Sequence, residues 1–176
     1  MNTRAMKIRA TNIKAIGVVL TSTLLFGCVG KIVKPDGPTA TVGVGVINFS
    51  QDQSIFSNEH VFIKMTQEGS DWGGQQVVNK GDPLHYNFSI PANKPVSLTV
   101  NLLQGGVGFD SVCGLALDLN MPELKAYDVK FTLIKEDKVV VGCTADLYDQ
   151  SSSEPKLLQS YKGGSSIRHF KAKFVY

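Results

Sequence analysis

The sequence predicts an all-β protein, an antiparallel β-sandwich of Ig-like or transthyretin-like style with about eight or nine strands. Apolar and polar residues alternate from Ala40 onward, which places one face of each strand in a core and the other in water. Segments rich in Gly, Pro, Asn and Asp interrupt the alternation roughly every 8–12 residues, as in sandwiches. No window shows the 3.6-residue stripe of an amphipathic helix.

Six stretches carry the alternation in chain order: residues 42–46, 61–65, 84–90, 96–102, 127–133 and 170–176. Such strands have one buried and one wet face, which is typical of antiparallel sheets, whereas buried parallel strands are apolar throughout. Turn signals separate the strands at Ser70–Gly74, Lys80–Pro83, Pro91–Pro95, Gln104–Gly108 and Lys162–Gly164. Glu136-Asp137 joins two strong strands and predicts a tight hairpin. We therefore assign residues 40–176 to one sandwich domain.

Cys113 and Cys143 are predicted to form a disulfide inside this domain. Cys113 shares its strand parity with Leu115, Leu117 and Leu119. Cys143 shares its parity with Val139, Val141, Ala145 and Leu147, so both sulfurs are expected to face an apolar interior. Closing a loop of about 30 residues stabilises a fold by about 3–4 kcal/mol in the chain-entropy model. Two buried free thiols or a metal site are the alternatives. No His and no CxxC pattern accompanies either cysteine, which argues against a metal.

Residues 1–27 have the pattern of a secretory signal peptide. Arg4, Lys7, Arg9 and Lys14 form a basic start without any acidic residue. A short, uncharged and mostly apolar run follows over residues 15–26. This run is too short for a membrane-spanning helix, which needs about 20 apolar residues.

The segment Leu25-Phe26-Gly27-Cys28 resembles the lipobox of bacterial lipoprotein precursors. The resemblance implies cleavage before Cys28, diacylglycerol on its sulfur and a fatty acid such as palmitate on the new amine. Two or three acyl chains give a stable membrane anchor. The alternative is that Cys28 is an ordinary residue of the signal peptide and that cleavage occurs elsewhere.

Val29 follows the cysteine where an Asp resembles the inner-membrane retention signal of enterobacteria-like lipoproteins, so the outer membrane is the expected location. Residues 28–39 contain two Pro and two Gly without useful periodicity, and are predicted to be the lipidated tether of the domain.

The net charge changes meaning once the signal peptide is set aside. The whole chain has 18 Lys+Arg against 15 Asp+Glu. Four of the basic residues lie in residues 1–27, which leaves 14 against 15 and a formal charge of −1 from Cys28 onward. The sequence therefore gives no reason to expect a nucleic-acid partner.

Patterns typical of enzymes are weak in this sequence, and we predict no catalytic residue, metal or cofactor. The histidines His60, His85 and His169 are dispersed and lack metal-ligand spacing, so they are expected on the solvated surface. No Gly-x-Ser-x-Gly motif is present. Residues 105–108 are Gly-rich but lack the Lys-Ser/Thr and the helix of a phosphate loop. The acidic residues of the loops match no EF-hand pattern.

Trp72 is the candidate partner-binding residue. It is the only tryptophan and lies in a Gly-rich loop, where aromatic side chains often anchor partners. The alternative is that Trp72 folds back and caps the sandwich. The basic residues Lys171 and Lys173 are read as charges on a wet edge strand, which discourage aggregation.

These features predict a lipid-anchored module on the periplasmic face of the outer membrane or on the cell surface. The preferred function is a binding or structural accessory of an envelope assembly, such as a secretion or surface complex, with a protein partner. The alternative is a periplasmic immunity or inhibitor lipoprotein that blocks a toxin or a hydrolase. A sugar-binding or hydrolytic role is a third hypothesis.

Overall fold

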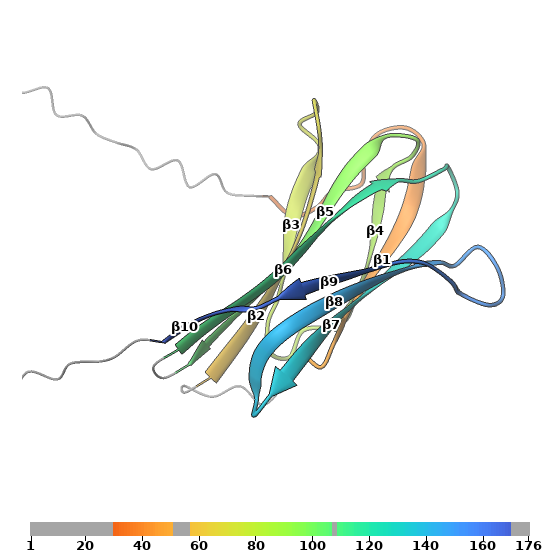
Figure 1. The fold of residues 1–176 in the computed structure, drawn as a ribbon. Helices are drawn as coiled ribbons and strands as arrows, with labels where there is room; N and C mark the ends of the chain where they lie inside the picture. Colours follow the sequence, from red (N-terminus) through yellow and green to blue (C-terminus); the bar gives the residue numbers. More distant parts are fainter. Residues whose placement is uncertain (1–29, 51–56, 107–108, 170–176) are drawn as a thin grey trace, which may run out of the picture.

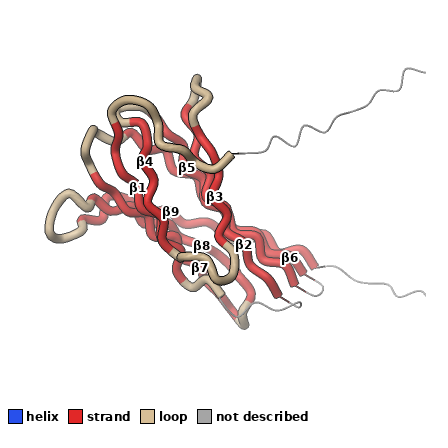
Figure 2. Tube along the Cα trace, turned by 180° about the vertical axis from the view of Figure 1, so that it is seen from behind, coloured by secondary structure: helices blue, strands red, loops and turns tan. Residues whose placement is uncertain are grey.

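The computed structural model describes residues 30–50, 57–106 and 109–169, and within these every regular element is a β-strand. Two five-stranded sheets pack face to face (Figure 1 and Figure 2). The strands are β1 (Thr39–Ile47), β2 (Ser57–Gln67), β3 (Gly73–Val78), β4 (His85–Pro91), β5 (Pro95–Gly106), β6 (Phe109–Asn120), β7 (Ala126–Glu136), β8 (Val139–Asp149), β9 (Lys156–Gly164) and β10 (Ser166–His169). The predicted all-β sandwich is confirmed.

The strand order is β4-β1-β7-β8-β9 in the first sheet and β10-β6-β5-β2-β3 in the second. We call them sheet A and sheet B. All pairs are antiparallel except β1 and β7, which run parallel with Val44 opposite Val129. A parallel pair needs a long crossover connection. The chain between β1 and β7 provides this connection, because it forms four strands of sheet B and strand β4 of sheet A. Alternation within a strand does not show which strand is its neighbour, so it did not predict the parallel pair.

The core consists of the inward faces of both sheets, as the alternation predicts. Its fully buried side chains include Val42, Val44, Ile63, Met65, Leu98, Val100, Leu117 and Phe131. In every one of the six alternating stretches that lies within the described residues, the apolar parity faces inward. The predicted strand over residues 170–176 lies outside the described residues.

The predicted inward parity of β8 is wrong at its start. Val140 is fully buried, whereas Val139 and Val141 are only half-buried. The register between β7 and β8 shifts between Ile134 and Lys135, where Gly142 and Val140 are the respective partners, so Val141 is an extra residue on β8. A β-bulge of this kind reverses the parity before it. Cys143 lies after the bulge and faces inward, as predicted.

Two further expectations differ from the structure. Lys162–Gly164, predicted as a turn, forms the end of β9, where Gly163 pairs with Cys143. The short strand β3 was not expected, because it directly follows the turn residues and shows only two apolar residues at its end. Together with β9 and β10, it brings the number of strands in the described residues to ten, where about eight or nine were expected.

The predicted disulfide is confirmed. Cys113 on β6 of sheet B and Cys143 on β8 of sheet A are bonded, with their Cα atoms 6.1 Å apart. The bond therefore crosses the core and links the two sheets covalently.

Residues 30–38 lie against the sandwich, in part of the segment predicted as a tether. We call this segment the N-terminal strap. The amide of Gln75 on β3 donates to the Gly30 carbonyl (2.9 Å), and the amide of Ala92, just after β4, donates to the Pro38 carbonyl (3.0 Å). The strap thus spans from the edge strand of sheet B to that of sheet A. No helix in the described ranges is long and apolar enough to cross a membrane.

Candidate functional site

Trp72 packs against the strap. Its indole nitrogen donates a hydrogen bond to the Val33 carbonyl (3.0 Å), and its ring lies partly buried at the margin of the core. Ser70 accepts a hydrogen bond from the Trp72 amide (3.1 Å), which shapes the turn before β3. The structure therefore shows Trp72 in a capping position, and its contact with a partner stays a prediction.

A hollow of about 470 Å³ lies between the strap and the β2–β3 loop. Its ionic lining consists of Lys34 and Asp36 from the strap, Asp71 beside Trp72, and Lys94 after β4. Two cations and two carboxylates leave its charge balanced. Such a lining gives no preference for a strongly charged ligand.

The outer face of sheet A carries a His–Asp pair that sequence reasoning missed. His85 on β4 and Asp128 on β7 reach across β1, and His85 Nε2 lies 2.9 Å from Asp128 Oδ1. Gly43 on β1 makes this contact possible, because a Cβ there would lie 2.9 Å from the same imidazole nitrogen. The sequence signal was Gly43 and Gly45, two glycines at outward positions of a strand.

A shallow hollow of about 430 Å³ adjoins this pair, with Ile47, Leu84 and Lys130 in its lining. The described residues that line it include no Ser, Thr or Cys, so the His–Asp pair faces no hydroxyl or thiol nucleophile there. The described part of the chain also contains no group of three His, Cys, Asp or Glu residues placed to hold a metal ion. His85 is half-exposed, in agreement with the predicted surface position, whereas the side chain of His169 lies outside the described ones.

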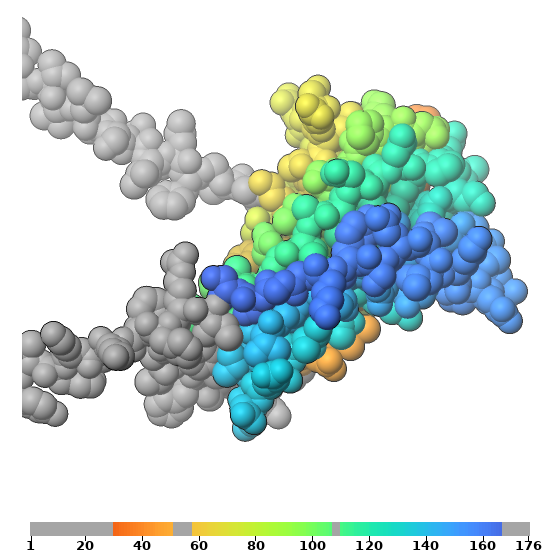
Figure 3. Space-filling model, in the orientation of Figure 1, coloured from red at the N-terminus to blue at the C-terminus, as the bar shows by residue number. Residues whose placement is uncertain are grey.

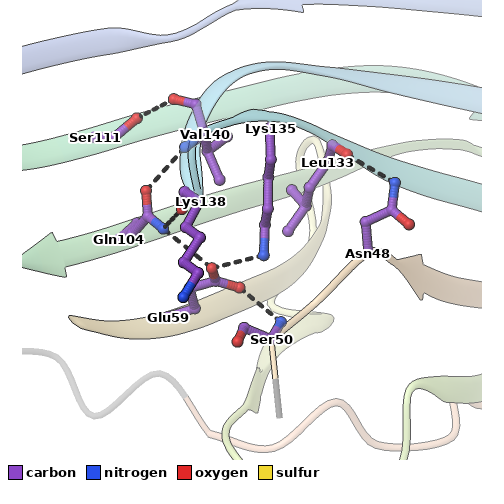
Figure 4. Close-up of polar contacts among 9 residues, drawn as sticks. All are labelled: Asn48, Ser50, Glu59, Gln104, Ser111, Leu133, Lys135, Lys138 and Val140. Atoms are coloured by element: carbon purple, nitrogen blue, oxygen red, sulfur yellow. Dashed lines mark hydrogen bonds and ion pairs between the residues drawn. The ribbon is translucent and has the colours of Figure 1, made fainter. Parts of the chain in front are cut away.

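A buried polar cluster joins the two sheets through the core (Figure 4). Glu59 on β2 is only 2% exposed, and its carboxylate contacts the Lys135 ammonium on β7 at 2.7 Å. The same carboxylate accepts hydrogen bonds from the Ser50 amide (2.8 Å) and from the Gln104 side chain (3.1 Å). An ion pair in the interior needs such additional partners to offset the loss of water. The cluster is therefore a polar tie between sheets.

Gln104 on β5 fixes the β7–β8 hairpin to sheet B. Its amide oxygen accepts from the Val140 amide (2.9 Å), and its amide nitrogen donates to the Lys138 carbonyl (2.8 Å). Asp137 and Lys138 at the hairpin tip both have positive φ, at 47° and 69°, which matches a type I′ turn. The predicted tight hairpin is confirmed, and its tip is held by a side chain from the opposite sheet.

Parity would have revealed this cluster in the sequence. Glu59 shares the inward parity of Val61, and Gln104 shares that of Leu102. Lys135 shares the parity of Leu133. Polar residues at core positions of strands indicate a buried network, because each needs a partner inside the protein.

Shifted pKa values occur at the surface and at the margin of the core. Hydrogen bonds from Ser151 lower the pKa of Asp149 at the end of β8. Burial raises the pKa of Tyr86 and of Tyr127, and the negative charges of Asp82 and Asp149 respectively add to this effect. The ionised Asp149 accepts the Ser151 amide (2.7 Å) and so fixes the start of the β8–β9 loop.

The edge of sheet A at β9 is exposed to solvent along its first half. All residues from Lys156 to Ser160 are exposed, and Leu157 and Leu158 are 50% and 47% exposed. The space-filling view shows this strand, in blue, lying across the surface (Figure 3). A register shift opposite Leu147 and Tyr148 leaves Leu158 as the extra residue of a bulge. An open edge with apolar side chains is a template for another strand.

No family model, no curated protein and no solved structure matches this chain. The site thus rests on the geometry of the chain itself. Cys28, the predicted lipidation site, lies outside the described residues.

Proposed function

We propose that this chain is an exported lipoprotein of the outer membrane, whose sandwich domain binds a protein partner as an accessory of an envelope assembly, such as a secretion or surface complex. The lipobox Leu25–Cys28 supports the anchor, and the disulfide agrees with an oxidising compartment outside the cytoplasm. The single observation that carries the binding role is the open edge at β9. The partner is expected to add a strand there by β-augmentation.

The edge at β9 has the features that strand addition needs. β9 hydrogen-bonds to β8 on one side and is the last strand of sheet A. Residues 157–161 (Leu-Leu-Gln-Ser-Tyr) contain neither a charge nor a proline, so of the features that usually protect an edge only the bulge at Leu158 is present there. Main-chain groups then supply affinity, and exposed Leu157 and Leu158 supply apolar contacts for specificity.

The other three edges offer less. The strap covers part of β3 through the bond from Gln75 to Gly30. β10 has four residues, and β4 ends at Pro91, which has no N–H to donate. Of the four edge strands that the structure describes, β9 is the longest, and its side chains are more exposed than those of β3 and β4.

The test compares partner capture by two exposed-leucine variants. The lipidated protein is purified from envelopes after mild crosslinking, as wild type, Leu158→Lys and Leu124→Lys. Leu124 is 88% exposed in the loop between β6 and β7, so it controls for a general effect of removing a surface leucine. We expect Leu158→Lys to lose the captured partner several-fold and Leu124→Lys to retain it. Equal capture by both variants contradicts binding at β9.

The anchor is tested separately. Cys28→Ser is expected to give either an unprocessed product that keeps its signal peptide or a product that is released from the membrane fraction. Unchanged mobility and fractionation contradict the lipoprotein assignment. If the captured partner is a toxin or a hydrolase whose activity falls in the complex, the inhibitor role replaces the assembly role.

A further inference from the structure

The N-terminal strap fixes where the chain enters the domain. Gly30 is held at the edge of sheet B by the amide of Gln75 (2.9 Å), and Gly74 on β3 lets the two segments approach closely. A Cβ on Gly74 would lie 2.6 Å from the Ile32 amide nitrogen, a distance that no side chain tolerates. Ile32 packs against the core, and Pro35 is buried. The contacts of the domain therefore extend at least as far as Gly30, well before β1.

Only two peptide steps separate Gly30 from Cys28. A fully extended chain covers at most about 3.6 Å per residue, so the two Cα atoms lie within about 7 Å of each other. If Cys28 carries the lipid, its acyl chains lie in the membrane and its backbone lies at the level of the headgroups. The edge of β3, which is hydrogen-bonded to Gly30, is then close to those headgroups.

We propose that the domain rests directly on its membrane, with the strap and the Trp72 loop against the lipid headgroups. The inference rests on the lipid anchor of the proposed function and adds an orientation to it. The strap takes up most of the residues that would otherwise have formed a flexible tether. Partner binding then occurs beside the membrane, at a fixed height.

The chemistry of this face suits a headgroup layer. Trp72 presents a partly exposed ring with a polar N–H, the kind of side chain that favours an interface between apolar and aqueous regions. Val33 is 61% exposed beside it, and Lys31 and Lys34 are exposed on the strap. Asp36 and Asp71 offset the lysines, so the face is nearly neutral and its position depends on the anchor and not on charge.

The opposite pole of the domain follows from the same geometry. The loop between β8 and β9 lies on the side of the sandwich away from the point where the strap begins (Figure 1). Ser153 is exposed in that loop. This loop is therefore directed away from the membrane and toward the aqueous space.

Trp72 is a built-in probe because it is the only tryptophan of the chain. The lipidated protein is reconstituted into vesicles of phosphatidylethanolamine and phosphatidylglycerol that contain a lipid with a dansyl group on its headgroup. Energy transfer from Trp72 to dansyl reports the distance of the strap from the headgroups. The mass of the N-terminal peptide is measured first, to show that Cys28 is lipidated.

Two variants provide the controls. The first moves the probe to the far pole by combining Trp72→Phe with Ser153→Trp. The second keeps Trp72 and inserts 20 Gly/Ser residues between Val29 and Gly30, a spacer with an average span of about 25 Å. Circular dichroism and the melting temperature confirm that both variants fold.

We expect strong transfer from Trp72 in the wild type, and several-fold weaker transfer both from the far-pole tryptophan and in the spacer variant. If Cys28 is lipidated but transfer from Trp72 equals that of the far-pole probe, or is unchanged by the spacer, the orientation is wrong and the anchored function stands. If the peptide mass shows no lipid, the anchored function fails and this inference fails with it.

Discussion

The sandwich has two lateral openings between its sheets, and opposite ends of the chain close them by different means. On one side the strap lies between the edge strands β3 and β4 and is held by single contacts, such as the bond from Trp72 to Val33 (3.0 Å). On the other side β9 of sheet A continues directly into β10 of sheet B. One continuous segment, β9 followed by β10, therefore hydrogen-bonds to both sheets on this side.

The second side is reinforced further. The disulfide joins β6 to β8 close by, and Cys113 lies near the carbonyls of Gly163 and Gly164 at the end of β9. Ser111 contacts Ser165, the residue between β9 and β10, through their hydroxyl groups at 2.7 Å. The closure by β9 and β10 therefore belongs to the cooperative core, whereas the closure by the strap depends on a few local hydrogen bonds.

The largest expected effect comes from breaking the covalent side. Replacing both cysteines, Cys113→Ala with Cys143→Ala, removes a crosslink over a separation of 30 residues. The free energy of unfolding should fall by about 3–4 kcal/mol, because the unfolded chain regains its loop entropy. Urea denaturation followed by circular dichroism measures the change.

Reduced wild-type protein is the control for this pair, since it lacks the bond but keeps both sulfurs. We expect it to lose nearly the same stability as the double variant. A loss below about 1 kcal/mol in both would mean that the disulfide adds little to this closure.

A smaller effect is expected from the polar tie that lies between the two sides. Lys135→Met leaves the Glu59 carboxylate buried without its cation, and Glu59 is only 2% exposed. Because the Ser50 amide and Gln104 still serve this carboxylate, we expect a loss of about 2–3 kcal/mol. The same urea denaturation measures it.

Combining Glu59→Gln with Lys135→Met removes both charges. The double variant is expected to be more stable than Lys135→Met alone, because no buried charge remains uncompensated. If the double variant is less stable than Lys135→Met, the loss of stability in Lys135→Met does not come from the uncompensated charge of Glu59.

The contrast between the two sides also explains how far the sequence could predict the structure. Alternation predicted the inward faces, and the Cys113–Cys143 bond followed from parity, because both depend on which side of a strand a residue occupies. The bulge at Val141 was not predicted, because one extra residue reverses the parity of a strand and leaves no pattern in the sequence. The run Leu157-Leu158 did not predict β9, because an edge strand exposed on both faces has no reason to alternate.

The strap and the His85–Asp128 pair were not predicted for another reason. Both depend on glycines that permit close approach, Gly74 under the strap and Gly43 under the pair. A sequence shows that a glycine is present but not which distant segment comes close to it. Contacts between segments far apart in the chain are fixed by strand order, and alternation does not specify strand order.

The smallest expected change in global stability, but the most informative for the comparison, comes from Gly74→Ala. The new methyl group would lie 2.6 Å from the Ile32 amide nitrogen and must push the strap off β3. Gln75 then loses its acceptor at Gly30, so its amide should exchange with solvent at least about tenfold faster, the effect of roughly 1.4 kcal/mol. The amide of Ser165, which donates to the Val141 carbonyl on the other side (3.2 Å), should keep its exchange rate.

Gly164→Ala is the matched control, because a Cβ there meets nothing within 4 Å. Hydrogen exchange followed by NMR measures both amides in one sample. Equal acceleration of Gln75 and Ser165 would show that the two closures open together, and the strap would then belong to the cooperative core.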